Sequence, residues 1–154
     1  KVVFKSDTKD PAVLFHIVPP FQGDPNDPRS VGATIAVYNS VAPGGELVVV
    51  GLPKEGWVAT GINSYKYTGA RTAAIVAATF KPDQISFKGG RELWAYSLNE
   101  PSQGRVAVAF FVSNTFYCSD APAKDTGGST AKNDRVDKFV AQPKTPAPPF
   151  CVGP

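Results

Sequence analysis

Glycine and proline interrupt this chain so often that long regular segments are disfavoured. The sequence holds 14 glycines and 15 prolines in 154 residues. Proline removes a backbone donor and breaks a helix, while glycine costs conformational entropy inside helices and strands. We therefore expect short segments joined by tight turns rather than a bundle of long helices.

Between these interruptions the apolar residues alternate with the period of two that is typical of β-strands. The segment Val106–Val112 is apolar on both faces, which predicts a central buried strand. Segments 33–38 and 91–98 alternate in the same way. The further candidate strands are Val2–Lys5, Val13–Val18, Leu47–Leu52, Tyr65–Thr68, Ala73–Phe80, Gln84–Lys88, Thr115–Cys118 and Val136–Val140.

About ten short strands with turn signals between them predict an all-β fold, either an antiparallel β-sandwich or a jelly roll. Residues 1–31 are expected to form an N-terminal strand arm with an Asp/Pro turn, and residues 32–154 a single β-sandwich domain. The polar stretch 120–134 predicts a long surface loop. Five prolines within 142–154 predict an extended C-terminal tail.

The two cysteines and the first residue suggest an exported protein. The chain has no methionine and starts with Lys1, which is expected after removal of a signal peptide. We expect a disulfide between Cys118 and Cys151 that pins the proline-rich tail; two free buried thiols are the alternative. Closing a loop of about 33 residues would stabilise the fold by about 4 kcal/mol in the chain-entropy model.

The charge pattern bears on the kind of partner. The 16 Lys and Arg against 13 Asp and Glu give a net charge of +3, and these residues are scattered along the chain. A nucleic-acid-binding domain normally concentrates basic residues on one face, so no nucleic-acid partner is expected. No apolar run approaches the roughly 20 residues of a membrane-spanning helix, so no transmembrane segment is expected.

The residues suited to catalysis and metal binding are few. His16 is the only histidine, and no nucleophile motif accompanies it, so we expect no enzyme activity. Asp24 and Asp27 flank Pro25 and Asn26, and their oxygens could contribute to a Ca²⁺ site. The alternative is an Asx-Pro double turn that leads into the strand at 33–38. No other cofactor is expected.

Aromatic residues offer a second functional interpretation. If several of them faced solvent together, they could stack on a sugar, and the protein would be a cell-surface carbohydrate-binding module. The alternative places them in the core or at the rim of a sandwich. The residues concerned are Trp57, Tyr65, Tyr67, Trp94, Tyr96 and Tyr117.

The N-terminal arm carries the preferred hypothesis, a non-catalytic structural or interaction protein that self-associates. Two apolar segments flank a polar linker at 6–11, and they could complete their own sheet or add as strands to the next subunit. Head-to-tail addition need not close, so it would build an extracellular filament. The residues expected to mediate self-association are Val2, Phe4, Val13, Phe15 and Ile17.

Several motifs between residues 32 and 151 resemble a family of uncharacterised secreted bacterial β-domains. They are Gly-Ala-Thr-Ile-Ala-Val-Tyr-Asn (32–39), Leu-Pro-Lys-Glu-Gly-Trp (52–57), Tyr-Lys-Tyr (65–67), Lys-Gly-Gly (88–90), Trp-Ala-Tyr-Ser-Leu-Asn-Glu-Pro-Ser-Gln-Gly-Arg-Val-Ala-Val (94–108), Tyr-Cys (117–118) and Pro-Ala-Pro-Pro-Phe-Cys (146–151). The resemblance implies export, to the medium or the surface of a bacterium, and a disulfide. It implies no activity.

Overall fold

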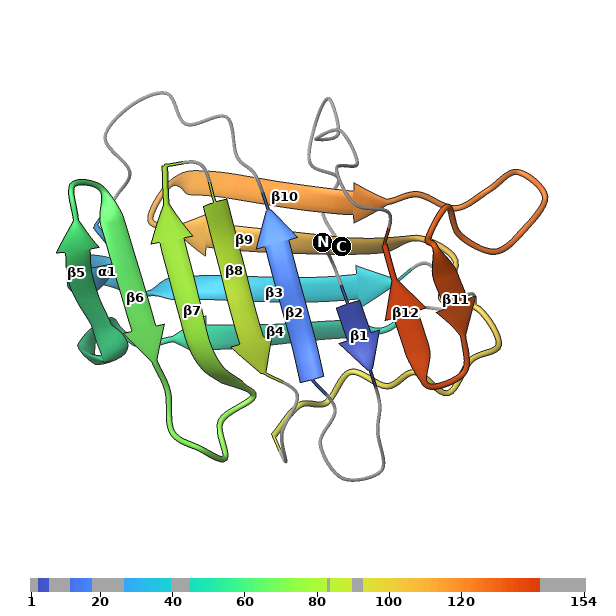
Figure 1. Ribbon diagram of the computed structural model, residues 1–154, viewed down its shortest axis with the longest axis horizontal. Helices are drawn as coiled ribbons and strands as arrows, with labels where there is room; N and C mark the ends of the chain where they lie inside the picture. Colours follow the sequence, from blue (N-terminus) through green and yellow to red (C-terminus); the bar gives the residue numbers. More distant parts are fainter. Residues whose placement is uncertain are drawn as a thin grey trace.

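The strands of this protein form two antiparallel sheets (Figure 1). The structure is a computed structural model that describes residues 3–5, 12–17, 27–39, 45–82, 84–89 and 93–141, with the backbone alone for 3–5 and 12–17. In spatial order, the eight-stranded sheet consists of β11 (Asn133–Arg135), β12 (Lys138–Val140), β1 (Val3–Lys5), β2 (Ala12–Ile17), β8 (Gln84–Gly89), β7 (Ile75–Lys81), β6 (Ser64–Thr68) and β5 (Trp57–Gly61). The four-stranded sheet consists of β10 (Thr115–Ala121), β9 (Val106–Val112), β3 (Ala33–Asn39) and β4 (Leu47–Leu52).

Aromatic rings from both sheets meet in the core, where the smaller sheet packs across the larger one (Figure 1). The ring centroid of Phe110 on β9 lies 5.4 Å from that of Phe80 on β7 and 5.1 Å from that of Phe87 on β8. Tyr117 of β10 lies 5.7 Å from Phe80. These large buried rings hold the two layers together. The predicted all-β fold is therefore confirmed, and two packed layers make it a β-sandwich.

The strand order favours the sandwich over the jelly roll. A jelly roll has eight strands in two Greek keys. Here β5 to β8 follow one another as neighbours in the larger sheet, and the pairs β3–β4 and β9–β10 are neighbours in the smaller one. Sequence neighbours therefore make most of the pairs, as hairpins do.

The most apolar segment occupies the place that its sequence predicts. β9 lies between β10 and β3, and six of its seven residues are buried. On β3, Ile35 and Val37 face the same core and are completely buried. A strand covered on both faces needs no polar alternation, which explains the unbroken apolar run in β9.

The predicted strand at 91–98 is wrong for the residues that the structure describes, since 93–98 form no strand. Tyr96 and Leu98 are buried, so the alternation of side chains is present without a backbone ladder. The backbone N–H of Ser97 donates instead to the Glu46 carboxylate at 2.6 Å. Trp94 is only partly buried at the margin of the core.

Two short strands are not predicted by the apolar periodicity of the sequence, and one predicted loop is shorter than expected. β5 has a single buried residue, Trp57, and β11 is the polar tripeptide Asn-Asp-Arg. Because β10 continues to Ala121 and β11 begins at Asn133, the loop predicted at 120–134 is reduced at both ends. A bridge between Ala123 and Ser129 gives the remaining segment local order.

Helix is scarce in the described part of the chain. The α-helix α1 (Pro28–Val31) precedes β3, and the 3₁₀ turn η1 (Lys54–Gly56) follows β4. Within the described residues, no helix has the length and apolar character that crossing a membrane would require.

Candidate functional site

The N-terminal arm contributes two strands to the middle of the eight-stranded sheet. β2 pairs with β8 over five residues, from Val13 opposite Gly89 to Ile17 opposite Ile85. β1 pairs with β2 on one side and with β12 on the other. The arm therefore completes the sheet of its own chain, which is one of the two arrangements that the sequence leaves open.

Most residues predicted to mediate self-association occupy register positions in these two strands. Phe4 lies opposite Phe139 of β12, and Phe15 lies opposite Phe87 of β8. Both partners, Phe139 and Phe87, are buried in the core. The remaining predicted positions are Val13 and Ile17 on β2, and Val2, which lies outside the described residues.

The strand beside the arm is positioned by a close backbone approach at its end. Gly89 pairs with Val13 of β2 on one side and with Ile75 of β7 on the other. A Cβ atom at Gly89 would collide with the carbonyl oxygen of Ala74 and come within 2.8 Å of the Ile75 side chain. Glycine therefore lets β7 and β8 approach each other at the point where β2 begins its pairing.

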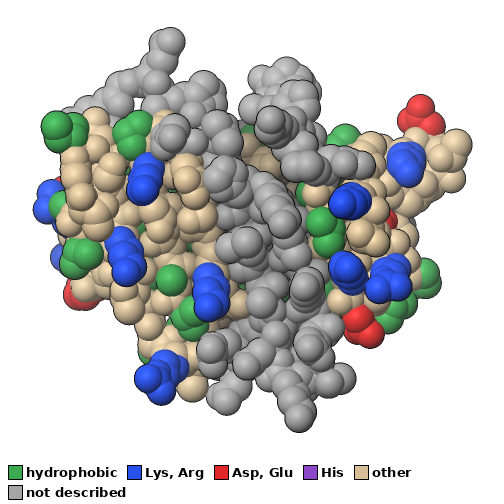
Figure 2. Space-filling view, viewed as in Figure 1, with side chains coloured by type: hydrophobic (Ala, Val, Ile, Leu, Met, Phe, Trp, Pro, Cys, Tyr) green, Lys and Arg blue, Asp and Glu red, His purple; other side chains and the backbone are tan. Residues whose placement is uncertain are grey.

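Charged side chains are spread over the face of the molecule that the larger sheet presents. Figure 2 shows Lys and Arg dispersed over both flanks of this face, without one concentrated basic patch. Among the described residues, no group of three or more His, Cys, Asp or Glu side chains is placed to hold a metal ion. The only histidine, His16, lies on β2 opposite Ser86 of β8.

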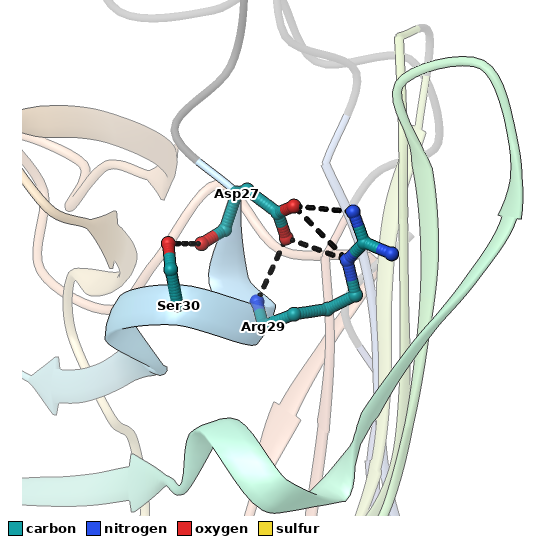
Figure 3. Close-up of polar contacts among 3 residues, drawn as sticks. All are labelled: Asp27, Arg29 and Ser30. Carbon is teal, nitrogen blue, oxygen red and sulfur yellow. Dashed lines mark hydrogen bonds and ion pairs between the residues drawn. The ribbon is translucent and has the colours of Figure 1, made fainter.

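Asp27, one of the two candidate Ca²⁺ ligands, caps the helix α1 (Figure 3). Its Oδ1 accepts from the backbone N–H of Arg29 at 2.9 Å, and its Oδ2 accepts from the guanidinium of Arg29 at 2.6 Å. These bonds hold the pKa of Asp27 below its ordinary value. Both oxygens thus have donors from the following helix, which agrees with the Asx-Pro turn interpretation. Asp24 lies outside the described residues.

The aromatic residues proposed as a sugar platform lie mainly inside the protein. Trp57 and Tyr67 pack with a centroid separation of 5.3 Å, and Tyr65 stacks on Phe80 at 5.9 Å. Rings buried in the core cannot stack on a sugar from solvent. Five of the six candidates are buried, namely Trp57, Tyr65, Tyr67, Tyr96 and Tyr117, and the sixth, Trp94, is partly buried.

A buried hydrogen-bond network surrounds Gln103, which is completely buried. Its side-chain oxygen accepts from Asn39 at 2.8 Å and from the Tyr96 hydroxyl at 2.9 Å, and its side-chain nitrogen donates to Glu100 at 2.7 Å. The backbone N–H of Gln103 donates to the Asp134 carboxylate at 2.7 Å. The network thereby joins the segment 96–105 to β3 and β11.

The chemistry of this network is that of a structural clamp. Burial raises the pKa of the Tyr96 hydroxyl well above its ordinary value, so the group stays protonated and donates. Hydrophobic periodicity cannot detect such a network because its members are polar and come from separate segments.

A second polar contact involves Arg105, at the C-terminal end of the segment 96–105. Arg105 donates from Nε to Asp120 of β10 at 2.9 Å, and its guanidinium lies 6.0 Å from the ring centroid of Tyr38. The hydrogen bond to Asp120, together with the attraction of its carboxylate, raises the pKa of Arg105, so the guanidinium stays charged. Asp120 is therefore held in an ion pair at the edge of the smaller sheet.

The structure describes one of the two cysteines. Cys118 lies on β10, opposite Ala109 of β9, and is partly buried. Cys151 lies outside the described residues. The predicted disulfide stays a prediction.

Comparison with known proteins adds no functional assignment. No protein-family model, no curated protein and no solved structure matches this chain.

Proposed function

We propose that this protein is a non-catalytic structural protein, exported by a bacterium, that assembles by donating its N-terminal arm to the next copy. The observation that supports the proposal most directly is the location of β1 and β2 between β8 and β12. An arm in the middle of a sheet makes backbone hydrogen bonds on both sides. It would therefore connect two copies firmly if it came from a neighbouring chain.

The arm pairs with parts of the chain that are distant in sequence. Its neighbours, β8 at 84–89 and β12 at 138–140, do not pair with each other when the arm is present. The same ladder forms whether the arm belongs to its own chain or to a neighbouring copy, because the register partners are identical. Exchange of an identical element between subunits therefore conserves the energy of these contacts.

The chain between the arm and the rest of the sandwich has the length that an exchange needs. Nine residues, 18–26, separate Ile17 from Asp27. Fully extended, nine residues span roughly 30 Å, about the diameter of a small domain. When each copy gives its arm to one neighbour and receives an arm from another, the contact is head-to-tail and extends into a filament.

A designed cysteine pair tests arm donation in the full chain. Lys5 of β1 lies opposite Lys138 of β12, and directly opposed residues in antiparallel strands have Cα atoms about 4.5–5.5 Å apart. That separation suits a disulfide. In the variant Lys5→Cys/Lys138→Cys, donation predicts a ladder of covalent multimers on a non-reducing denaturing gel, which reductant collapses to monomer.

The single variants Lys5→Cys and Lys138→Cys serve as matched controls and should give no ladder. If the double variant yields only covalent monomer at every concentration, the arm is an intramolecular pair of strands and the proposal fails. Deleting residues 1–21 is a less specific test, because it removes two central strands from the sheet together with the proposed joint.

Export and the Cys118–Cys151 disulfide are part of the same proposal. Their support is the sequence evidence, namely the cysteine placement and the resemblance to secreted bacterial β-domains. An extracellular filament is exposed to an oxidising environment in which a disulfide persists. The sugar-binding alternative has less support, since the aromatic residues on which it rests are mainly in the core.

A further inference from the structure

In the described part of the chain, the smaller sheet ends in a strand whose outer edge is unpaired and carries no charged residue. β4 pairs with β3 and has no strand on its other side among the described residues (Figure 1). Its sequence, Leu-Val-Val-Val-Gly-Leu, contains no charge and no proline. Such an edge is a template for pairing with another strand, and soluble proteins usually protect it.

The hydrogen bond at the end of the β3–β4 pair fixes which backbone groups face outward. The backbone N–H of Asn39 donates to the backbone carbonyl of Glu46 at 3.0 Å, so the backbone groups of Glu46 face β3. Alternation then directs the backbone groups of Val48 and Val50 toward β3, and those of Leu47, Val49 and Gly51 away from it. Within the described part of the chain, these three outward residues have no backbone hydrogen bond beyond the sheet.

The same three positions are open to solvent. The exposed fraction is 60% for Val49 and 49% for Leu47. A Cβ atom built at Gly51 would have no other atom within 4 Å. The outer edge of β4 therefore offers both unpaired backbone groups and uncovered apolar side chains.

The other three edge strands carry the protective features that β4 lacks. β5 contains a bulge between Ala59 and Gly61. β11 has only three residues and includes Asp134 and Arg135. β10 carries Asp120 in its ion pair with Arg105. Bulges, short length and charges all disfavour edge-to-edge pairing.

We infer that β4 pairs with β4 of a second copy, antiparallel and about a two-fold axis at Val49. In this register the outward residues match one another, because Val49 faces Val49 and Leu47 of each copy faces Gly51 of the other. The exposed leucine covers the open space beside the glycine. About six backbone hydrogen bonds form, and the two small sheets become one continuous sheet.

Charge at the ends of the strand also favours a second copy as the occupant. Glu46 precedes β4 and Lys54 follows it on the turn η1. Antiparallel pairing brings Glu46 of one strand toward Lys54 of the other at both ends of the interface, with Glu55 one residue further along the turn. Opposite charges in this arrangement favour the antiparallel orientation.

The substitution Val49→Lys tests this contact in the full chain. A charge on an edge strand blocks pairing, so the dissociation constant of the dimer should rise at least about tenfold in sedimentation equilibrium. The matched control is Val58→Lys, at a residue of β5 that is 55% exposed on the bulged edge. It should leave the dissociation constant unchanged.

The variant Val49→Cys distinguishes a lost contact from a misfolded protein, because it is expected to produce a new covalent product rather than to abolish a signal. Val49→Cys places two thiols at the two-fold axis, where it should form a covalent dimer under mild oxidation, and Val58→Cys should form none. Equal effects of the lysine variants at 49 and 58, or no covalent dimer from Val49→Cys, would overturn the inference. The arm-donation ladder of Lys5→Cys/Lys138→Cys should persist when Val49→Lys is added, so the two contacts can fail separately.

Discussion

At the scale of single residues, the glycines with the closest neighbours show where the chain has no freedom. Gly89 sits at the end of β8, where the backbone of Ala74 leaves no room for a side chain. Gly61 on β5 is different, because a Cβ there would make only an ordinary contact of 3.7 Å with Ser64. The sequence alone does not distinguish these two glycines, because their different roles depend on the atoms packed around them.

The pair Gly89→Ala and Gly61→Ala should therefore differ sharply in stability. We expect Gly89→Ala to lower the free energy of unfolding by about 3 kcal/mol, since the new methyl group must displace backbone rather than a flexible side chain. Gly61→Ala should change it by less than about 1 kcal/mol. Urea unfolding with fluorescence detection measures both. Equal midpoints for the two variants would contradict the close approach at Gly89.

At the scale of elements, the sequence predicts best those strands that obey simple periodicity. β3, β4, β8 and β9 lie where alternation or an apolar run places them. The segment 93–98 has the same alternation but no ladder, because its polar groups bond to Glu46 and Gln103 instead of to a neighbouring strand. β11 was missed for the opposite reason, since it has a ladder without any apolar pattern.

The candidate site shows the same division between local and long-range information. The apolar segments of the arm predict strands, and β1 and β2 confirm them. Their place between β8 and β12 depends on pairing partners that lie far away in sequence, which no local pattern specifies. The open edge of β4 likewise follows from strand order rather than from its own residues.

Because Tyr96 belongs to the buried hydrogen-bond network around Gln103, we expect the free energy of unfolding to decrease at alkaline pH. The unfolded tyrosine loses its proton near pH 10, whereas burial keeps the folded one protonated to higher pH. The contribution of the protonated Tyr96 hydroxyl to the free energy of unfolding is therefore fully present below pH 10 and decreases as the pH rises above 10. The loss approaches about 1.4 kcal/mol per pH unit.

Removing the hydroxyl separates this effect from the hydrogen bond itself. At pH 7 we expect Tyr96→Phe to lower the free energy of unfolding by about 1 kcal/mol, because Gln103 loses one donor. Between pH 10 and pH 11 the wild-type protein should lose about 1 kcal/mol more than the variant. Urea titrations at several pH values give both quantities. If the free energy of unfolding changed with pH in the same way for the two proteins, the pKa of Tyr96 would be the same in the folded and unfolded states.

At the scale of the whole molecule, the two sheets are joined by their aromatic core and by the four chain connections β2–β3, β4–β5, β8–β9 and β10–β11. β12, the last strand among the described residues, belongs to the larger sheet, and the buried residue Ala141 follows it. Cys118 belongs to the smaller sheet. A bond from Cys118 to Cys151 would thus tie the segment after β12 to the opposite layer.

The lengths are compatible with such a tie. Nine residues, 142–150, separate Ala141 from Cys151, and an extended proline-rich chain of that length reaches roughly 30 Å. Packed sheets lie only about 10 Å apart. The disulfide would then stabilise the sandwich by restricting its unfolded chain and would not require a change in either sheet.

We therefore expect both cysteines to resist alkylation in denaturant until a reductant is added, as measured by mass spectrometry. The variant Cys151→Ser should lower the free energy of unfolding by about 4 kcal/mol, the value expected for closing a loop of this size. A reductant should lower the midpoint of the wild-type protein to that of the variant and leave the variant unchanged, which separates the bond from any effect of the serine. Alkylation of both thiols in unreduced protein would show instead that the aromatic core alone holds the two layers together.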